Sequence, residues 1–151
     1  MKASRFGIAL VVLALSLVAA GTAFAASGPP ARAATVAAAP SGLGRILVDS
    51  RGRTLYLFEK DRKGTSACSG FCTAYWPPLL AKGKSLASKG AKRSLLGSIR
   101  RADGTRQVTY AGHPLYLFSG DTKRGQTNGQ GLTDFGAPWY ALTPAGKTIV
   151  R

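Results

Sequence analysis

A ten-residue segment occurs twice in this chain, at residues 52–61 and again at residues 112–121, so that each of its positions recurs 60 residues later. The copies read Gly-Arg-Thr-Leu-Tyr-Leu-Phe-Glu-Lys-Asp and Gly-His-Pro-Leu-Tyr-Leu-Phe-Ser-Gly-Asp. Each copy follows a β-prone run and precedes a loop that ends in a tryptophan, Trp76 or Trp139. Because self-similarity at a fixed period is typical of duplicated supersecondary units, the sequence predicts two pseudo-symmetric halves.

The centre of each copy is a Leu-Tyr-Leu-Phe run that is apolar at every position. Successive side chains of a β-strand point to opposite faces, so Tyr56 and Phe58 share one face in the first copy. Tyr116 and Phe118 do the same in the second copy. A strand that is apolar on both faces needs cover on both sides, which predicts that these strands form the centre of the core. The alternative is an aromatic groove that meets a ligand. Further aromatic candidates for such a groove are Trp76, Trp139 and Tyr140.

An aspartate follows each of these strands, Asp61 in the first copy and Asp121 in the second. A carboxylate at a strand end can accept hydrogen bonds from the backbone of the following turn, and this is the role we expect. The alternative pairs the two aspartates across a pseudo-twofold axis, as acid and base or as cation ligands. His113 is the single histidine of the chain, which excludes a histidine-based metal cluster. No catalytic set, metal site or cofactor is predicted.

Turn signals elsewhere divide the chain into short strands. The Asp-Gly pair at 103–104 lies between two β-prone runs and is typical of a hairpin. We also expect residues 46–48 to form a hairpin with residues 54–58. The 19 glycines and eight prolines argue against long helices. The sequence predicts a small all-β domain with about seven strands. They are expected at residues 46–48, 54–58, 95–101, 106–110, 115–118, 139–143 and 148–150.

The first 25 residues have the pattern of a signal peptide. Lys2 and Arg5 precede an apolar run at 6–20, and a small-x-small cleavage site follows at 23–25. The run is shorter than the roughly 20 residues of a membrane-spanning helix, so we expect no transmembrane segment in the mature protein. We expect export to the periplasm or the extracellular space. The expected divisions are a signal peptide at 1–25, a flexible linker at 26–44 and a duplicated domain at 45–151, with repeat one at about 45–80 and repeat two at about 95–151.

The chain is strongly basic, with a formal net charge of +15 from 21 basic and six acidic side chains. Basic residues are densest between Lys82 and Arg106. Such a charge attracts polyanions, so an anionic cell-envelope polymer or lipid headgroups are the expected partners. A solvated basic surface without a specific partner is the alternative. No nucleic-acid motif surrounds the dense stretch, so no specific nucleic-acid partner is predicted. The oligomeric state is left open.

The two cysteines of the chain are Cys68 and Cys72. In an exported protein an isolated pair favours a disulfide. The turn-forming residues Ser-Gly-Phe between them allow the two Cα atoms to approach within the roughly 7 Å that a bridge requires. The closed loop is small, so the bridge stabilises the fold by only about 2 kcal/mol in the chain-entropy model. We expect the bridge to pin one loop, and a redox-active thiol pair is the alternative.

These motifs together resemble the bacterial secreted-repeat family, whose members are described as predicted lipoproteins with a Tyr-x-(Phe/Trp/Tyr)-x-x-Asp motif. The resemblance covers residues 45–150 and rests on the Cys-Ser-Gly-Phe-Cys loop, the following Trp-Pro-Pro, the Asp-Gly turn and the second Leu-Tyr-Leu-Phe run. It implies an envelope protein without an assigned activity, and its association with hydrocarbon catabolism implies no mechanism. The chain departs from the lipoprotein pattern because no lipid-acceptor cysteine lies at the cleavage site. We therefore expect a non-enzymatic binding or structural module for anionic envelope components, with a redox or electron-transfer accessory protein as the alternative.

Overall fold

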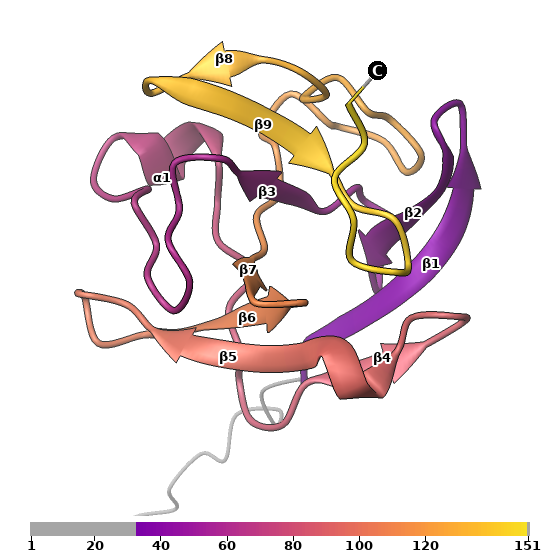
Figure 1. The fold of residues 1–151 in the computed structure, drawn as a ribbon, viewed down its shortest axis with the longest axis horizontal. Coiled ribbons are helices and arrows are strands. Elements are labelled where there is room, and N and C mark those ends of the chain that lie inside the picture. Colours follow the sequence, from indigo (N-terminus) through magenta and orange to yellow (C-terminus); the bar gives the residue numbers. More distant parts are fainter. Residues whose placement is uncertain (1–32, 151) are drawn as a thin grey trace, which may run out of the picture. The chain divides into compact units, whose positions relative to one another are not determined.

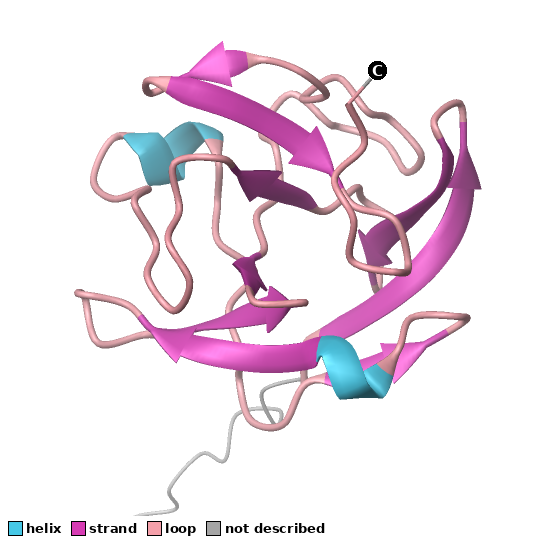
Figure 2. Cartoon of the chain, in the orientation of Figure 1, coloured by secondary structure: helices cyan, strands magenta, loops and turns pink. Residues whose placement is uncertain are grey.

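The structure, a computed structural model, describes residues 33–150. These residues form nine short strands, which lie in three small sheets, and two short helices (Figures 1 and 2). The elements are β1 (Thr35–Ser41), β2 (Gly44–Asp49), β3 (Tyr56–Phe58), α1 (Cys72–Tyr75), β4 (Leu86–Ser88), the 3-10 helix η1 (Arg93–Leu95), β5 (Leu96–Arg100), β6 (Arg106–Tyr110), β7 (His113–Pro114), β8 (Thr133–Asp134) and β9 (Ala137–Ala141). The all-β prediction is confirmed. The predicted signal peptide and residues 26–32 lie outside the described residues.

The three sheets have the strand orders β2-β1-β4, β3-β9-β8 and β5-β6-β7. All pairs are antiparallel except β1 with β4, which is parallel. Within residues 33–150, no helix has the length and apolar character needed to cross a bilayer.

The expected flexible linker at 26–44 is wrong for its described part, because β1 lies within it. β1 pairs with β2 over six residues, from Val36 opposite Asp49 to Ser41 opposite Gly44. Val36 is fully buried and Ala37 is 6% exposed. Composition suggested a linker because the segment has few large apolar side chains. Small side chains nevertheless suffice here, because neighbouring strands satisfy the backbone and both faces of β1 are covered, Val36 by an aliphatic cluster and Ala37 by an aromatic one.

The predicted hairpin between 46–48 and 54–58 is present at its turn, but it does not extend along residues 56–58. β2 pairs along its length with β1. Its contact with the chain before β3 is short: a bridge between Val48 and Thr54, with hydrogen bonds from Leu55 N to Leu47 O (3.0 Å) and from Asp49 N to Arg53 O (2.9 Å). The side chain of Asp49 accepts hydrogen bonds in the turn that follows β2. The chain then leaves β2, and β3 pairs with β9 of the second repeat.

The two faces of the motif strands pack into two separate clusters, as their period-two alternation predicts. One cluster is mainly aromatic and includes Tyr56, Phe58, Trp76, Tyr116 and Trp139. The other is mainly aliphatic and includes Leu55, Leu57, Leu115 and Leu117. Phe118 is partly buried against the aromatic cluster. The motif segments are therefore the centre of the core. The strand predicted at 115–118 is wrong, however, because in the second copy only Tyr116 forms isolated β-bridges, with Tyr56 and Pro78.

The two repeats meet at the motif tyrosines. Tyr56 N donates to Tyr116 O, and Tyr116 N donates to Tyr56 O, each over 2.9 Å. This reciprocal pair marks a pseudo-twofold axis between the copies. β3 of the first repeat also pairs with β9 of the second, with Phe58 opposite Trp139, and Figure 1 shows the two strands side by side.

The end of each repeat completes the hairpin of the other. Leu142, three residues after Trp139, accepts a hydrogen bond from Leu47 N of the β1–β2 hairpin over 2.9 Å. Leu79, three residues after Trp76, accepts the matching bond from Val108 N of the β5–β6 hairpin over 2.8 Å. The repeats are consequently interlocked, and neither buries its own core alone.

Candidate functional site

Each motif tyrosine donates a hydrogen bond to the motif aspartate of the other repeat. Tyr56 OH donates to Asp121 Oδ2 over 2.6 Å, and Tyr116 OH donates to Asp61 Oδ2 over 2.8 Å. The second oxygen of each carboxylate accepts from a backbone N–H in the loop that follows it, over 2.9 Å for Asp121 and 2.7 Å for Asp61. The aspartates thus make the backbone contacts that the sequence predicts. In addition, they link the two halves.

The aromatic residues of the motif form a stack that crosses the pseudo-twofold axis. Trp76 and Trp139 stack at 3.9 Å with an interplanar angle of 6°. Phe58 stacks on Trp139 at 4.0 Å, and Phe118 lies against Trp76 at 4.5 Å. Each phenylalanine therefore packs on the tryptophan of the other repeat. Each tyrosine meets the tryptophan of its own repeat edge-on, with ring centroids 5.4 and 5.1 Å apart.

These contacts place the motif rings inside the protein. Tyr56, Trp76, Tyr116 and Trp139 are fully buried, and the rings fill the space between one another. Tyr140, the remaining aromatic candidate, is partly buried against the aliphatic cluster. The described rings of the motif stack do not line an open groove. In the structure the motif residues pack the core and hold the two repeats together.

Burial raises the pKa values of the motif aspartates and tyrosines. Burial raises the pKa of Asp61 to about 6, although hydrogen bonds from the following backbone and from Tyr116 act in the opposite direction. Burial also raises the pKa of Asp121 above its ordinary value. The pKa values of Tyr56 and Tyr116 are raised, mainly by burial and further by the neighbouring carboxylates. The tyrosines are therefore hydrogen-bond donors at neutral pH.

The predicted disulfide between Cys68 and Cys72 is present, with the two Cα atoms 5.4 Å apart. The residues between them form the expected turn, and the short helix α1, which was not predicted, follows it. Cys68 is fully buried and Cys72 is 5% exposed, both within the aromatic cluster. Reactive disulfides are usually accessible to solvent, so this bridge has the setting of a structural one.

The dense basic stretch of the sequence folds around a hollow of about 430 Å³. Lys84, Arg93 and Arg106 line it, together with the hydroxyl side chains of Ser85 and Ser98. All three basic residues are exposed, and the described lining contains no acidic side chain. We call these residues the basic hollow. It lies among the loop before β4, η1 and the β5–β6 hairpin, at the lower end of the view in Figure 1.

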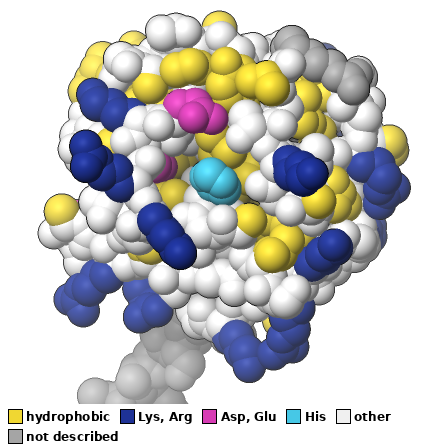
Figure 3. All heavy atoms as spheres, in the orientation of Figure 1, with side chains coloured by type: hydrophobic (Ala, Val, Ile, Leu, Met, Phe, Trp, Pro, Cys, Tyr) yellow, Lys and Arg dark blue, Asp and Glu magenta, His cyan; other side chains and the backbone are white. Residues whose placement is uncertain are grey.

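The acidic side chains are mostly engaged elsewhere. Asp49 forms an ion pair with Arg53 over 2.8 Å, Asp61 and Asp121 hold the motif tyrosines, and Asp134 accepts from Trp76 Nε1 over 3.3 Å. The exposed basic side chains are spread over the surface, as Figure 3 shows for one face. The field outside the protein is consequently positive.

Sequence reasoning missed two features because separate elements bring them together. The first is the buried arginine Arg101 at the β5–β6 turn. The second is an exposed aromatic cluster made by Phe71, Tyr75 and Phe135. His113 is partly buried and lines a separate cavity with Asp61. Residues 33–150 contain no group of three or more His, Cys, Asp or Glu side chains that could hold a metal ion.

A family model described as a secreted repeat of unknown function matches residues 38–80 and again residues 97–143. The chain belongs to this family. The two matched segments are the two interlocked repeats, and the first of them starts within β1. The secreted-repeat description indicates export. No curated protein and no solved structure matches the chain significantly.

Proposed function

We propose that this secreted-repeat protein is a non-enzymatic binding module of the cell envelope that holds an anionic, phosphate-bearing polymer in its basic hollow. The observation that carries the proposal is the convergence of Lys84, Arg93 and Arg106 on one concave surface. Export to the periplasm or the extracellular space would place the module beside such polymers. The buried motif supplies the rigid scaffold.

The arrangement of charge supports a ligand. Arg100 of β5 lies directly opposite Arg106 of β6 in the hairpin register. Like charges at opposed positions of an antiparallel pair destabilise the hairpin, and a bound anion would relieve this repulsion. Arg106 also donates to Ser98 Oγ over 2.6 Å, which orients its guanidinium at the hollow.

The expected affinity depends steeply on salt. A flexible polyanion loses about 0.7 of a counterion for each neutralised phosphate. With about three contacts, one for each basic side chain of the hollow, affinity would fall about 20-fold between about 50 and about 200 mM salt. A dispersed basic surface would also respond to salt, so the decisive evidence is the location of binding.

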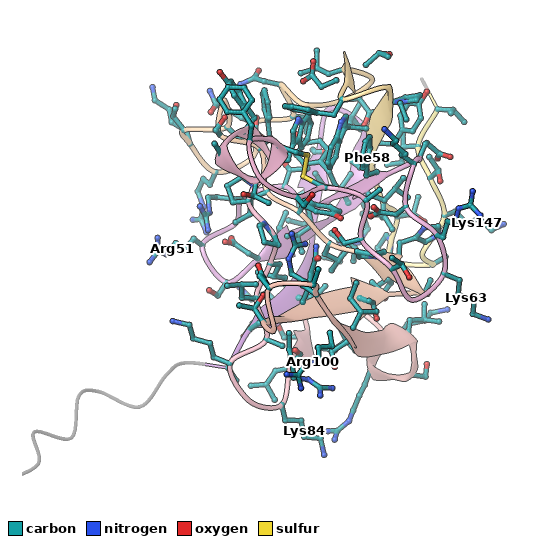
Figure 4. The ribbon with its side chains drawn as sticks, turned by 90° about the vertical axis from the view of Figure 1, so that its left-hand side faces the viewer. Arg51, Phe58, Lys63, Lys84, Arg100 and Lys147 are labelled. Carbon is teal, nitrogen blue, oxygen red and sulfur yellow. A yellow bond between two sulfur atoms is a disulfide. The ribbon has the colours of Figure 1, made fainter. Side chains whose placement is uncertain are left out.

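The test compares two triple variants with the same loss of charge. The first, Lys84→Gln/Arg93→Gln/Arg106→Gln, removes the basic hollow. The control, Arg51→Gln/Lys63→Gln/Lys147→Gln, removes exposed charges from other regions. Figure 4 shows Arg51, Lys63 and Lys147 away from Lys84.

Binding of soluble inorganic polyphosphate to the folded protein is followed by fluorescence anisotropy. We expect the hollow variant to lose at least tenfold in affinity while the control loses less than threefold, since only the first removes converging charges. Equal losses in both variants would show that the charge acts without a site. Tighter binding to phosphatidylglycerol vesicles than to polyphosphate would assign the hollow to lipid headgroups.

The redox alternative has weaker support. Trp76 and Trp139 stack closely, and they belong to the same aromatic cluster as the disulfide. Both cysteines are buried, however, and reactive disulfides are usually accessible to solvent. The binding module is therefore the better-supported function.

A further inference from the structure

A second cavity, of about 370 Å³, lies between the disulfide loop and the β5–β6 turn. Its polar lining comprises Ser66, Ser69, Thr73, Arg101 and Asp103. Figure 4 faces this side of the molecule, with α1 and the disulfide above and Arg100 of β5 below. The cavity shares no lining residue with the basic hollow.

Arg101 is a buried cation whose hydrogen bonding is incomplete. It is 7% exposed, and its terminal nitrogens donate to Ser66 Oγ (2.9 Å), Gln107 Oε1 (2.5 Å) and Cys68 O (2.6 Å). Its Nε is buried and has no hydrogen-bond partner among residues 33–150. The carboxylate of Asp103 lies 3.6 Å from it. A buried donor without a partner is destabilising and calls for an explanation.

The other half of the molecule shows that the fold does not require this polar cluster. Val108 and Leu47 make matching backbone bonds in the two hairpins, so Gln107 corresponds to Ile46. By the same register, Arg101 corresponds to Ser41. Ile46 is fully buried in the aromatic cluster. The matching positions of the first repeat thus hold Ile46 and the partly exposed Ser41, and neither carries a charge. A buried charge does not in general stabilise a core, so packing alone does not account for Arg101.

We propose that this cavity binds a sugar ring of an envelope glycan through Arg101 and Asp103. The guanidinium of Arg101 is a hydrogen-bond donor and the carboxylate of Asp103 is an acceptor, and both line this cavity. A sugar hydroxyl can accept from the guanidinium and donate to the carboxylate. An anion would meet the carboxylate of Asp103, whose pKa is held below its ordinary value by hydrogen bonds from Thr105. Asp103 is 59% exposed, and its Oδ1 accepts from Thr105 N and Thr105 Oγ1, so Oδ2 is the oxygen that a sugar hydroxyl would meet.

An exposed aromatic cluster borders the same loop. Phe71, between Gly70 and Cys72, is 72% exposed, and its ring centroid lies 5.1 Å from Tyr75 and 6.5 Å from Phe135. Phe135 and Gly136, with φ values of +58° and +90°, form the two-residue turn between β8 and β9, which places the Phe135 ring at the surface. An exposed group of large apolar side chains is typical of a binding surface. Aromatic faces pack well on the apolar C–H faces of pyranose rings, so this cluster extends the site for adjoining sugars.

The proposal does not depend on the basic hollow, and salt distinguishes the two sites. Hydrogen bonds and aromatic contacts to a neutral glycan are only weakly screened by ions, whereas binding of a polyanion is strongly weakened by them. A neutral glycan should therefore bind equally well at low and at moderate ionic strength.

The test uses neutral tetrasaccharides of N-acetylglucosamine, glucose and mannose as probes. Binding is followed by chemical-shift changes of the folded, disulfide-bonded protein. We expect at least one of the probes to shift the amides of the disulfide loop and the β5–β6 turn. Asp103→Ala and Phe71→Ala, both at exposed positions, should each weaken binding at least fivefold. The Lys84→Gln/Arg93→Gln/Arg106→Gln variant should bind as the unmodified protein does.

Three results would overturn the proposal. The first is the absence of binding by every probe. The second is binding that Asp103→Ala leaves unchanged, since a role for the donor–acceptor pair requires a loss. The third is a shift of the same amides by inorganic phosphate alone, which would make the cavity an anion site. Far-UV circular dichroism of both alanine variants separates lost binding from lost folding.

Discussion

The exchange of hydrogen bonds between the repeats can be measured as a coupling free energy. The perturbations are Tyr56→Phe, which removes only the hydroxyl, and Asp121→Asn, which removes the charge of its partner. The hydroxyl donates to Asp121 over 2.6 Å and accepts from Gly129 N over 3.3 Å. Asp121 is 6% exposed, so water does not readily replace the lost donor.

The expected magnitude follows from these contacts. A hydrogen bond to a charged group contributes about 1.5–3 kcal/mol, and a buried acceptor left with one donor fewer adds to the loss. Tyr56→Phe should therefore lower the free energy of unfolding by about 2 kcal/mol. The coupling between Tyr56→Phe and Asp121→Asn should be about 1–2 kcal/mol. No hydrogen bond joins Tyr56 to Asp61 of the same repeat, so that pair should be additive within about 0.5 kcal/mol.

The assay is urea unfolding of the oxidised protein, followed by tryptophan fluorescence. Trp76 and Trp139 are both fully buried, so their emission reports the core directly. Unchanged slopes against urea would show that the variants unfold from the same compact state. A larger coupling for Tyr56 with Asp61 than for Tyr56 with Asp121 would refute the crossed arrangement.

Three further outcomes follow from the geometry. Because burial raises the pKa of Asp61 from 3.8 to about 6, its contribution to stability is complete below about pH 4 and is lost as the pH rises through about 6. Asp61 is partly exposed, and after allowance for this the free energy of unfolding should fall by about 1 kcal/mol over that pH range. Asp61→Asn should remove this part of the pH dependence in urea titrations. An unchanged pH profile would contradict the raised pKa of Asp61. Opening the disulfide by Cys68→Ala/Cys72→Ala should lower the unfolding free energy by about 2 kcal/mol or more, and a variant as stable as the parent in thermal melts would show that the loop needs no bridge. A Cβ added at Gly129 would lie 2.8 Å from the buried indole ring of Trp76, so Gly129→Ala should lower the free energy of unfolding by about 1–3 kcal/mol. Gly42→Ala is the control and should be neutral, because nothing lies within 4 Å of its added Cβ. Equal melting temperatures for the two variants would argue against this packing.

The alternation of the motif strands was predictable because it depends only on local backbone geometry. In an extended chain, Tyr56 and Phe58 must share a face whatever surrounds them. The nature of the linker was not predictable in the same way. Val36 and Ala37 are small, and their burial depends on β2 and β4 lying beside them. Composition alone does not report such a partner.

The candidate sites divide similarly. The dense basic stretch and the cysteine pair were visible in the sequence, because charge and spacing are local properties. The cavity at Arg101 was not visible, since its walls come from the disulfide loop of one repeat and the hairpin turn of the other. Phe71 and Phe135 likewise lie 64 positions apart in sequence, at ring centroids 6.5 Å apart.

The amino-acid sequence by itself determined that the chain has two copies of a β-forming unit, which residues of each copy share a face, and that one disulfide pins a loop. Periodicity and spacing carry this information because they act over a few residues. Only the tertiary structure decided that the hydroxyls of Tyr56 and Tyr116 each donate a hydrogen bond to the aspartate of the other copy. Tyrosine–aspartate pairs within one repeat and pairs between the two repeats satisfy the same local rules, and the packing of the whole core decides between them.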